Sequence, residues 1–203
     1  MKTVFVNPER CVGCKQCQIA CAVEHSQSKT LFQSLSEEQK PRPRILVASG
    51  LYLDTSFPNK CRHCEPAPCM TICPTGAISR IEKTGIVIVD ETKCIACAMC
   101  AMVCPFDVIT FYTSSLNKLA AIKCDHCVER QDRGEIPACV ETCKTGALVF
   151  GDINELVKTA RTKLAQSVSI AVKEIDAGEA RIPANISAWR GMGEAISKMG
   201  KEN

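Results

Sequence analysis

The residues that decide the fold read CIACAMCAMVCP and occupy positions 94–105. Their four cysteines have the spacing C-x2-C-x2-C-x3-C, and a proline follows the fourth. Three such thiolates can lie on one tight loop, whose backbone amides can also point at the sulfur atoms. The same spacing recurs at residues 11–21. Both stretches therefore predict loops that bind an inorganic centre through several thiolates at once.

All sixteen cysteines of the 203-residue chain fall into four groups of four, and none is left over. Groups one and three share the spacing above and consist of Cys11, Cys14, Cys17 and Cys21, and of Cys94, Cys97, Cys100 and Cys104. Group two has the spacing C-x2-C-x4-C-x3-C and consists of Cys61, Cys64, Cys69 and Cys73. Group four has the spacing C-x2-C-x11-C-x3-C and consists of Cys124, Cys127, Cys139 and Cys143.

The spacing favours iron–sulfur clusters over other uses of cysteine. C-x2-C-x2-C-x3-C-P is the ligand pattern of a cubane [4Fe–4S] cluster, and its fourth cysteine binds the other cluster of a two-cluster fold. Zinc is the alternative metal, but it usually takes two separated C-x2-C pairs, so a third cysteine two residues after a pair is superfluous. Disulfides are disfavoured because the N-terminus has neither a signal-peptide pattern nor a twin-arginine pair, which predicts a reducing, cytoplasmic location.

Composition excludes several further classes. The chain is 46% hydrophobic and 23% charged, so it is neither disordered nor fibrous, and its aromatic content of 4% argues against a conventional aromatic core. The longest uncharged run has 14 residues, at 66–79, which is shorter than the roughly 18 apolar residues of a membrane span. The formal net charge is +3 without a run of five basic residues, so neither nucleic-acid binding nor membrane insertion is expected.

An internal repeat predicts how the groups pair. Residues 4–10 and 87–93, which precede groups one and three, align without a gap, down to the basic residue before the first cysteine. Groups two and four both begin Cys-x-His-Cys and end Cys-x-Thr-Gly-Ala. Groups two and three, with 20 residues between them, reproduce the order of a two-cluster ferredoxin. Groups four and one should then form a second unit with their chain order reversed.

We therefore expect three cysteines of each cluster to come from one group and the fourth from its mate. Cluster 1 has Cys11, Cys14, Cys17 and Cys143, and cluster 2 has Cys61, Cys64, Cys69 and Cys104. Cluster 3 has Cys94, Cys97, Cys100 and Cys73, and cluster 4 has Cys124, Cys127, Cys139 and Cys21. Pairing groups three and four across 19 residues is the competing arrangement, which loop length does not exclude.

The predicted fold class is α+β, with two bacterial-ferredoxin-like two-cluster units, one inserted in the other. The outer unit covers 1–60 and 106–151 and includes an insertion at 22–60, which reads as a solvated loop or a partner contact. The inner unit covers 61–105. Residues 152–203 are expected to be a helical extension, because apolar residues recur there at helical spacing from 153 to 175.

Smaller elements are predicted as well. Strands are expected at 85–89, 108–112 and 119–123, and a hairpin at 45–47 and 51–53. Gly178 can end the long helix, and Trp189 is a candidate interface anchor. His63 and His126 occupy equivalent places in the repeat, where each ring could donate to a cluster sulfur or simply pack in its loop.

At this point the chain resembles a known family. The matching stretches are CRHCEPAPC at 61–69, CPTGAI at 73–78, KCDHC at 123–127 and GEIPACVETC at 134–143. They resemble the four-cluster ferredoxin-type electron-transfer subunits of dimethyl-sulfoxide-reductase, formate-dehydrogenase and hydrogenase complexes, over about residues 1–151. Groups one and four depart from the pattern, because Ala22 and Lys144 replace the proline after the last cysteine. That proline ligates nothing, so the ligand assignment is unaffected.

The resemblance implies four [4Fe–4S] clusters, the pairing given above and a line of clusters that relays electrons between a catalytic subunit and a second redox partner. The short form without an anchor resembles partners of carbon monoxide dehydrogenase, hydrogenase, formate dehydrogenase or tungsten aldehyde oxidoreductase. No catalytic residues are expected, because the sequence has no Walker loop, no complete GxGxxG motif and no radical S-adenosylmethionine loop. A catalytic iron–sulfur enzyme and a zinc-rich structural or nucleic-acid-binding module are the alternatives.

Overall fold

The computed structural model describes residues 2–50, 55–114 and 116–176. The chain divides into one unit at Met1–Ile153 and a second at Asn154–Asn203. All sixteen cysteines lie in the first unit. Gly178 and Trp189, the predicted helix stop and interface anchor, lie outside the described residues.

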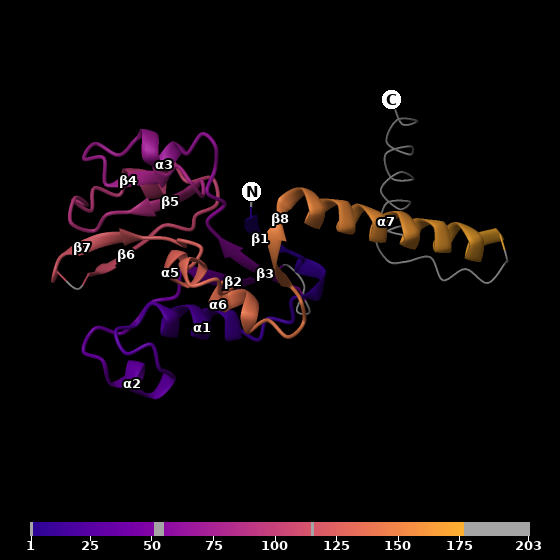
Figure 1. Cartoon of the computed structure of the whole chain (residues 1–203), viewed down its shortest axis with the longest axis horizontal. Coiled ribbons are helices and arrows are strands. Elements are labelled where there is room, and N and C mark those ends of the chain that lie inside the picture. The colour runs from indigo at the N-terminus through magenta and orange to yellow at the C-terminus, as the bar shows by residue number, and fades with distance from the viewer. Residues whose placement is uncertain (1, 51–54, 115, 177–203) are drawn as a thin grey trace, which may run out of the picture. The chain divides into compact units, whose positions relative to one another are not determined.

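The first unit begins and ends in one sheet. Strand β1 (Lys2–Val6) pairs antiparallel with β8 (Leu148–Asp152), so that Lys2 lies opposite Asp152 and Val6 opposite Leu148. Figure 1 shows the two strands side by side. Because β1 leads into group one and β8 follows group four, this pairing brings together cysteines more than a hundred residues apart in the chain.

Three hairpins supply the other strands that the structure describes, each as a two-stranded antiparallel sheet. Their bounds are β2 (Ile45–Ser49) with β3 (Ser56–Lys60), β4 (Ile78–Ile81) with β5 (Ile86–Val89), and β6 (Thr110–Thr113) with β7 (Leu119–Ile122). The strands predicted at 85–89, 108–112 and 119–123 are confirmed within two residues. The predicted hairpin at 45–53 is wrong in its second strand, since β2 pairs with 56–60 and residues 51–54 lie outside the described part.

The helices of this unit are short, and most of them carry cysteines. Their bounds are the 3-10 helix η1 (Pro8–Arg10), α1 (Gln16–Glu24), α2 (Leu31–Ser36), α3 (Pro68–Thr71), α4 (Met99–Met102), α5 (Val128–Asp132) and α6 (Ala138–Glu141). The third cysteine of every group lies in one of these helices, namely Cys17 in α1, Cys69 in α3, Cys100 in α4 and Cys139 in α6. The helices therefore turn the chain so that one loop presents several thiols.

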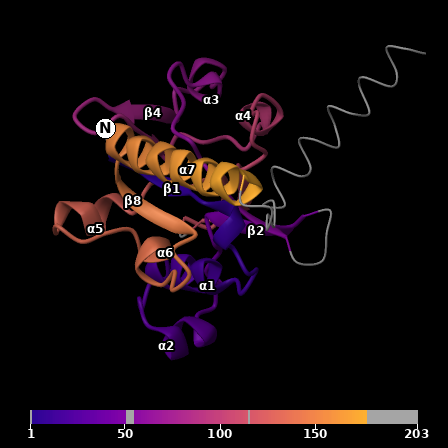
Figure 2. The ribbon, with the colours of Figure 1, turned by 90° about the vertical axis from the view of Figure 1, so that its right-hand side faces the viewer.

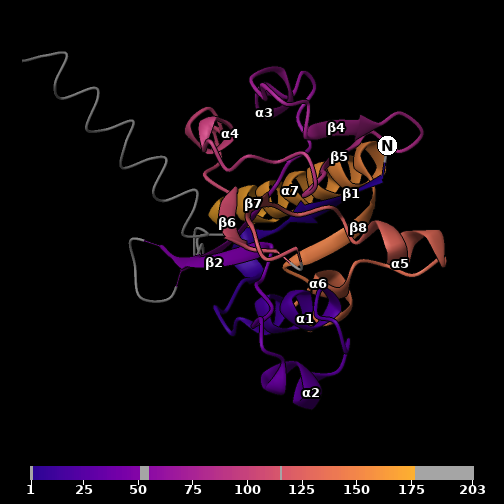
Figure 3. The same cartoon turned by 90° about the vertical axis from the view of Figure 1, so that its left-hand side faces the viewer.

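Two ends of the first unit can be recognised. Helices α3 and α4 lie near strand β4 at one end, and α2 lies at the opposite end, beyond α1 (Figures 2 and 3). Helix α1 packs beside α6, which brings a helix of group one against a helix of group four.

The buried core consists of three small clusters of residues, and each of them contains cysteines. Val4, Ile45 and Leu148 pack with Cys17, Cys21 and Cys139 in the first. Ile78, Val87 and Ile109 pack with Cys100 in the second. The third joins Cys61 and Cys124 through Val108. Cysteine side chains thus form part of the core in a chain that has few aromatic residues.

Helix α7 (Ile153–Asp176) forms the described part of the second unit. Its bounds confirm the long helix predicted from the apolar spacing, and Glu155 lies in its first turn, where an acidic side chain interacts favourably with the helix dipole. Leu156, Ala160 and Leu164 follow at four-residue intervals and share one face. None of the described helices is long and apolar enough to cross a membrane.

Candidate metal centres

The four cysteine loops share one backbone conformation. In each loop the second residue after the first cysteine has a positive φ. These residues are Gly13 (68°), His63 (51°), Ala96 (53°) and His126 (58°). Only glycine adopts this left-handed region freely, so its occurrence at three other residues indicates that the loop imposes it.

This conformation turns a backbone amide toward a sulfur atom. In three of the loops the N–H of the positive-φ residue donates to the Sγ of the first cysteine of its group. The N–Sγ distances are 3.4 Å for His63 and Cys61, 3.5 Å for Ala96 and Cys94, and 3.4 Å for His126 and Cys124. Amide donors of this kind stabilise negative charge on a thiolate, and they influence the potential of any cluster that it binds.

Groups one and four meet around one cavity. Cys11, Cys14 and Cys17 line it together with Cys143, in a space of about 230 Å³. The exposed aliphatic Val12 lies at its edge, with 69% of its surface accessible. Three cysteines of one group are thus gathered with the last cysteine of another.

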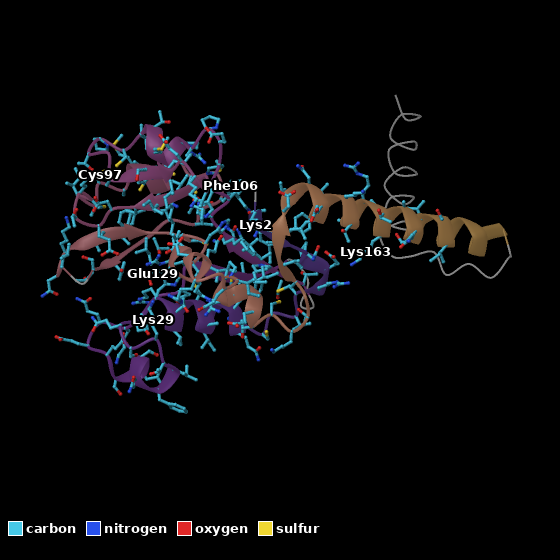
Figure 4. All side chains as sticks on the ribbon, viewed as in Figure 1. Lys2, Lys29, Cys97, Phe106, Glu129 and Lys163 are labelled. Carbon is cyan, nitrogen blue, oxygen red and sulfur yellow. The ribbon has the colours of Figure 1, made fainter. Side chains whose placement is uncertain are left out.

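Groups two and three meet in the same way around two further cavities. One is lined by Cys61, Cys64, Cys69 and Cys104. The other is lined by Cys73, Cys94, Cys97 and Cys100. Each set again combines three cysteines of one group with the last cysteine of the other. Cys97 is exposed, as is its neighbour Ile95, and Figure 4 shows Cys97 at the end of the unit that carries α3.

The remaining four cysteines are all buried. They are Cys21, Cys124, Cys127 and Cys139. They lie close enough for their charges to interact, since Cys124 and Cys127 act on Cys21, and all three act on Cys139. The backbone N–H of Arg44 donates to Cys21 Sγ at 3.2 Å, so the insertion before group two supplies a donor to this set.

Burial makes several of the thiols in the four sets poor acids. It raises the pKa of Cys17 and of Cys100 to about 11 and that of Cys127 to about 12. Burial also raises the pKa of Cys139. Thiols in such surroundings become thiolates at neutral pH only if a metal replaces the proton, and metal ligation does this because the ligand is the thiolate.

The Thr of the Cys-x-Thr-Gly-Ala repeat has a role that the sequence pattern did not suggest. Thr75 Oγ1 lies 3.7 Å from Cys73 Sγ, and Thr145 Oγ1 lies 3.7 Å from Cys143 Sγ. Burial, the largest single effect, raises the pKa of both cysteines, but the threonine hydroxyls and nearby amides together lower it. The net effect lowers the pKa of the last cysteine of groups two and four from its ordinary value, which favours the thiolate form.

The separation of the thiols suits a cubane better than a single zinc ion. Four thiolates on one zinc ion lie about 3.8 Å apart, because the Zn–S bond is about 2.3 Å and the geometry tetrahedral. Among the described residues, the sets with three possible ligand atoms within 4.8 Å contain one cysteine each. They are His63, Cys124 and His126, and His25, Asp125 and Cys127. The donor sets of four cysteines therefore fit a centre larger than one ion.

The insertion contributes residues that the sequence analysis missed. Asp125 of group four accepts from Arg44 Nη1 at 2.6 Å and lies 3.1 Å from His25 Nε2. Lys29 pairs with Glu129 of α5 at 2.7 Å (Figure 4). The interpretation of 22–60 as a solvated loop is wrong for this part. The available signal was the Asp in Cys-Asp-His-Cys, where group two has Arg62, because a carboxylate that is partly removed from water favours a cationic partner.

Comparisons with known proteins supply the family. The family described as "4Fe-4S dicluster domain" matches residues 54–153 of this chain. An iron–sulfur protein of Rhodospirillum rubrum is 36% identical over 177 residues, which cover 82% of this chain and 90% of that protein. The electron transport protein HydN of Escherichia coli is 37% identical over 172 residues, which cover 79% of this chain and 93% of that protein. This chain belongs to that family of 4Fe–4S electron-transfer proteins.

A third relative is a subunit of the anaerobic dimethyl sulfoxide reductase of Escherichia coli, 35% identical over 76% of this chain and 75% of that protein. Among solved structures, the BamBC active site complex of benzoyl coenzyme A reductase with benzoyl-CoA aligns over 95% of this protein, at 19% identity. Its TM-score of 0.37 is too low to inform the fold.

Membership of this family confirms the resemblance seen in the sequence, the electron-transfer function and the [4Fe–4S] type of cofactor. Several of the relatives are named as electron-transport proteins or as electron-transfer subunits. This 4Fe–4S electron-transfer protein is accordingly a carrier of electrons and not an enzyme, and its α+β fold is ferredoxin-like.

Proposed function

We propose that the chain relays electrons through four [4Fe–4S] clusters between a catalytic redox subunit and a second redox partner. The observation that carries this proposal is the gathering of the sixteen thiols into four sets of four. Each set holds one cluster, with the ligands predicted for clusters 1 to 4 from the sequence. A bound cluster supplies one-electron redox chemistry, and the chain's residues ligate it, orient it and shield it from water.

The proposed architecture is an inner two-cluster unit at 61–105 inserted in an outer unit at 1–60 and 106–151. The hairpin of β4 and β5, which joins groups two and three, supports the inner unit. The pairing of β1 with β8 supports the outer unit, because it ties group one to group four. The cavity shared by group one and Cys143 argues in the same direction, against the competing pairing of groups three and four. The helical extension at 152–203 stays a prediction beyond the end of α7.

The order of the clusters follows from burial. Cys14 and Cys97 are exposed, whereas Cys61 and Cys124 lie together in one buried core. Clusters 1 and 3 then form the two ends of the relay, and clusters 4 and 2 its centre. Electrons enter and leave where a cluster loop reaches the surface, and the aliphatic Val12 and Ile95 are placed there to exclude water from a docked protein.

The partner is proposed to be a catalytic redox subunit, because relatives are named as subunits of tetrathionate, thiosulfate and dimethyl sulfoxide reductases. The types expected from the sequence, namely carbon monoxide dehydrogenase, hydrogenase, formate dehydrogenase and tungsten aldehyde oxidoreductase, stay predictions, as does a cytoplasmic location.

The proposal is tested by loading the full chain with iron and sulfide under anaerobic conditions. About sixteen irons per chain are expected, with a broad absorbance near roughly 400 nm that dithionite bleaches. A colourless zinc protein, or a fully loaded chain with fewer irons, contradicts the four-cluster relay.

A further inference from the structure

A basic residue stands directly before the first cysteine of every group. The four residues are Arg10, Lys60, Lys93 and Lys123. The structure divides them into two kinds. Arg10 and Lys93 are exposed, and Lys93 pairs with Asp90 at the surface. Lys60 and Lys123 are only 1% and 3% exposed.

A buried ammonium group needs compensation, because removing it from water is costly. No carboxylate of the described residues lies within 4.0 Å of Lys60 or Lys123. Their Nζ atoms instead donate to the backbone carbonyls of Cys61 (3.1 Å) and Cys124 (3.3 Å). Neutral backbone carbonyl groups leave both positive charges without a carboxylate partner among the described residues. An anionic group is therefore expected beside each of them.

Each of the two lysines precedes one cysteine group but reaches toward the cysteines of another. Lys123 precedes group four, but its Nζ donates to the carbonyl of Val87 on β5. Its side chain lines the cavity of Cys61, Cys64, Cys69 and Cys104. Lys60 precedes group two, but its Nζ donates to His126 Nε2 at 3.2 Å and lies close enough to act on Cys124 and Cys139. Lys60, which precedes group two, thus faces cysteines of group four, and Lys123, which precedes group four, faces cysteines of group two.

We propose that Lys60 and Lys123 are crossed positioning residues: Lys60, which precedes group two, raises the reduction potential of cluster 4, and Lys123, which precedes group four, raises that of cluster 2. This inference rests on the proposed function. One electron from the donor protein adds one negative charge to a cluster, while no bond forms or breaks and no proton is transferred. A buried positive charge stabilises that added charge strongly, because the interior has a low dielectric constant.

The two buried lysines affect which clusters hold the electrons. The exposed Arg10 and Lys93 are screened by water and salt, so the terminal clusters 1 and 3 receive no comparable stabilisation. An electron that enters from either end therefore finds its most stable positions in the middle of the chain, on clusters 2 and 4.

The test is an anaerobic redox titration followed by electron paramagnetic resonance, on the full chain with its iron counted. Lys123→Met should lower the potential of one cluster, and Lys60→Met that of a different one, with about sixteen irons retained in each. Lys93→Met is the matched control, since this lysine holds the same place before group three but is exposed. It should leave all potentials unchanged.

Unchanged potentials in fully loaded Lys60→Met and Lys123→Met chains overturn the inference. Should a Met variant lose iron, the corresponding Arg variant decides, because it keeps the charge. An Arg variant that binds the full iron content and has the original potential supports the inference. An Arg variant that restores neither the iron nor the potential, or only one of the two, overturns it. A wild-type chain with too few irons contradicts the proposed function instead, so the two failures are distinct.

Discussion

The imidazole rings of His63 and His126 lie 4.1 Å apart, centroid to centroid, and are tilted by 54°. The two residues hold equivalent places in groups two and four, so this contact joins the two halves of the internal repeat. The backbone N–H of Val87 donates to His63 Nδ1 at 3.0 Å, which places the proton of the neutral ring on Nε2. That Nε2 is buried without a hydrogen-bond partner among the described residues.

His63 lines the same cavity as Cys61, Cys64, Cys69 and Cys104, so its free N–H is expected to donate to cluster 2. His63→Leu should lower the potential of one cluster, because a donor to the reduced cluster is lost. It should also cost about 1–3 kcal/mol of stability, since the Val87 N–H is left unsatisfied. Redox titration and thermal unfolding measure the two effects. A loaded variant with its original potentials contradicts the hydrogen bond.

The contact of Arg44 with Asp125 should stabilise the proposed cluster 4, whose four cysteines are buried. Arg44→Met removes a partly buried ion pair, and the expected cost is about 1–3 kcal/mol, below the value for a fully buried pair. We expect a chelator to remove a quarter of the iron faster from this variant than from the unchanged protein. The decrease of the cluster absorbance measures the rate. Lys29→Met is the matched control, because its ion pair with Glu129 also ties the insertion to group four but is exposed. Equal rates of iron loss in the two variants contradict this role.

The left-handed residue of the cysteine loops predicts opposite changes of the unfolding temperature for substitutions in group one and in group three. A Cβ at Gly13 would come within 2.6 Å of Ser56 Oγ, and its φ is +68°. Gly13→Ala should therefore lower the unfolding temperature by several degrees, at about 1–2 kcal/mol for the backbone alone. Adding Ser56→Ala should remove the clash and restore part of the loss. A double variant no more stable than Gly13→Ala excludes the clash as a cause.

Ala96 occupies the equivalent place in group three, with a φ of 53°. Ala96→Gly should raise the unfolding temperature by about 2–4 °C, because glycine relieves strain of about 1 kcal/mol there. Calorimetry of the loaded chain measures the change, and Ala101→Gly in helix α4 is the control, which should lower the temperature. A decrease for both variants contradicts a loop that imposes the left-handed conformation.

Removal of the clusters should unfold most of the first unit. Every buried core of this unit contains cysteines, and free thiols cannot replace the bonds that a cluster makes between loops. After chelation under reducing conditions, amide hydrogen exchange should lose protection at Asn7, whose N–H donates to the carbonyl of Ala147, and at Phe5, which lies two residues earlier on β1 and faces β8 in the same way. Retained protection in the cluster-free chain indicates a fold that does not depend on metal.

The insertion shows where prediction from the sequence failed. Its apolar and charged residues have no regular period, so nothing local distinguishes Arg44, which contacts Asp125, from the other basic residues nearby. The hairpin was misplaced for a related reason. Strand β2 pairs with 56–60, and its Ile45 and Val47 pack with Cys17 and Cys21 of group one, contacts that no local pattern records.

The chemistry of this protein could be read from its amino-acid sequence without a structure. Ligands a few residues apart on one loop are held together by the covalent backbone, so their spacing specifies thiolate-bound clusters whatever the rest of the protein does. The repeat also predicted which groups should pair. Only the folded structure distinguishes the buried Lys60 and Lys123 from the exposed Arg10 and Lys93, which hold the same place in the repeat. Burial depends on segments distant in the chain, and here β5 and group four close over the two central lysines, which no local pattern records.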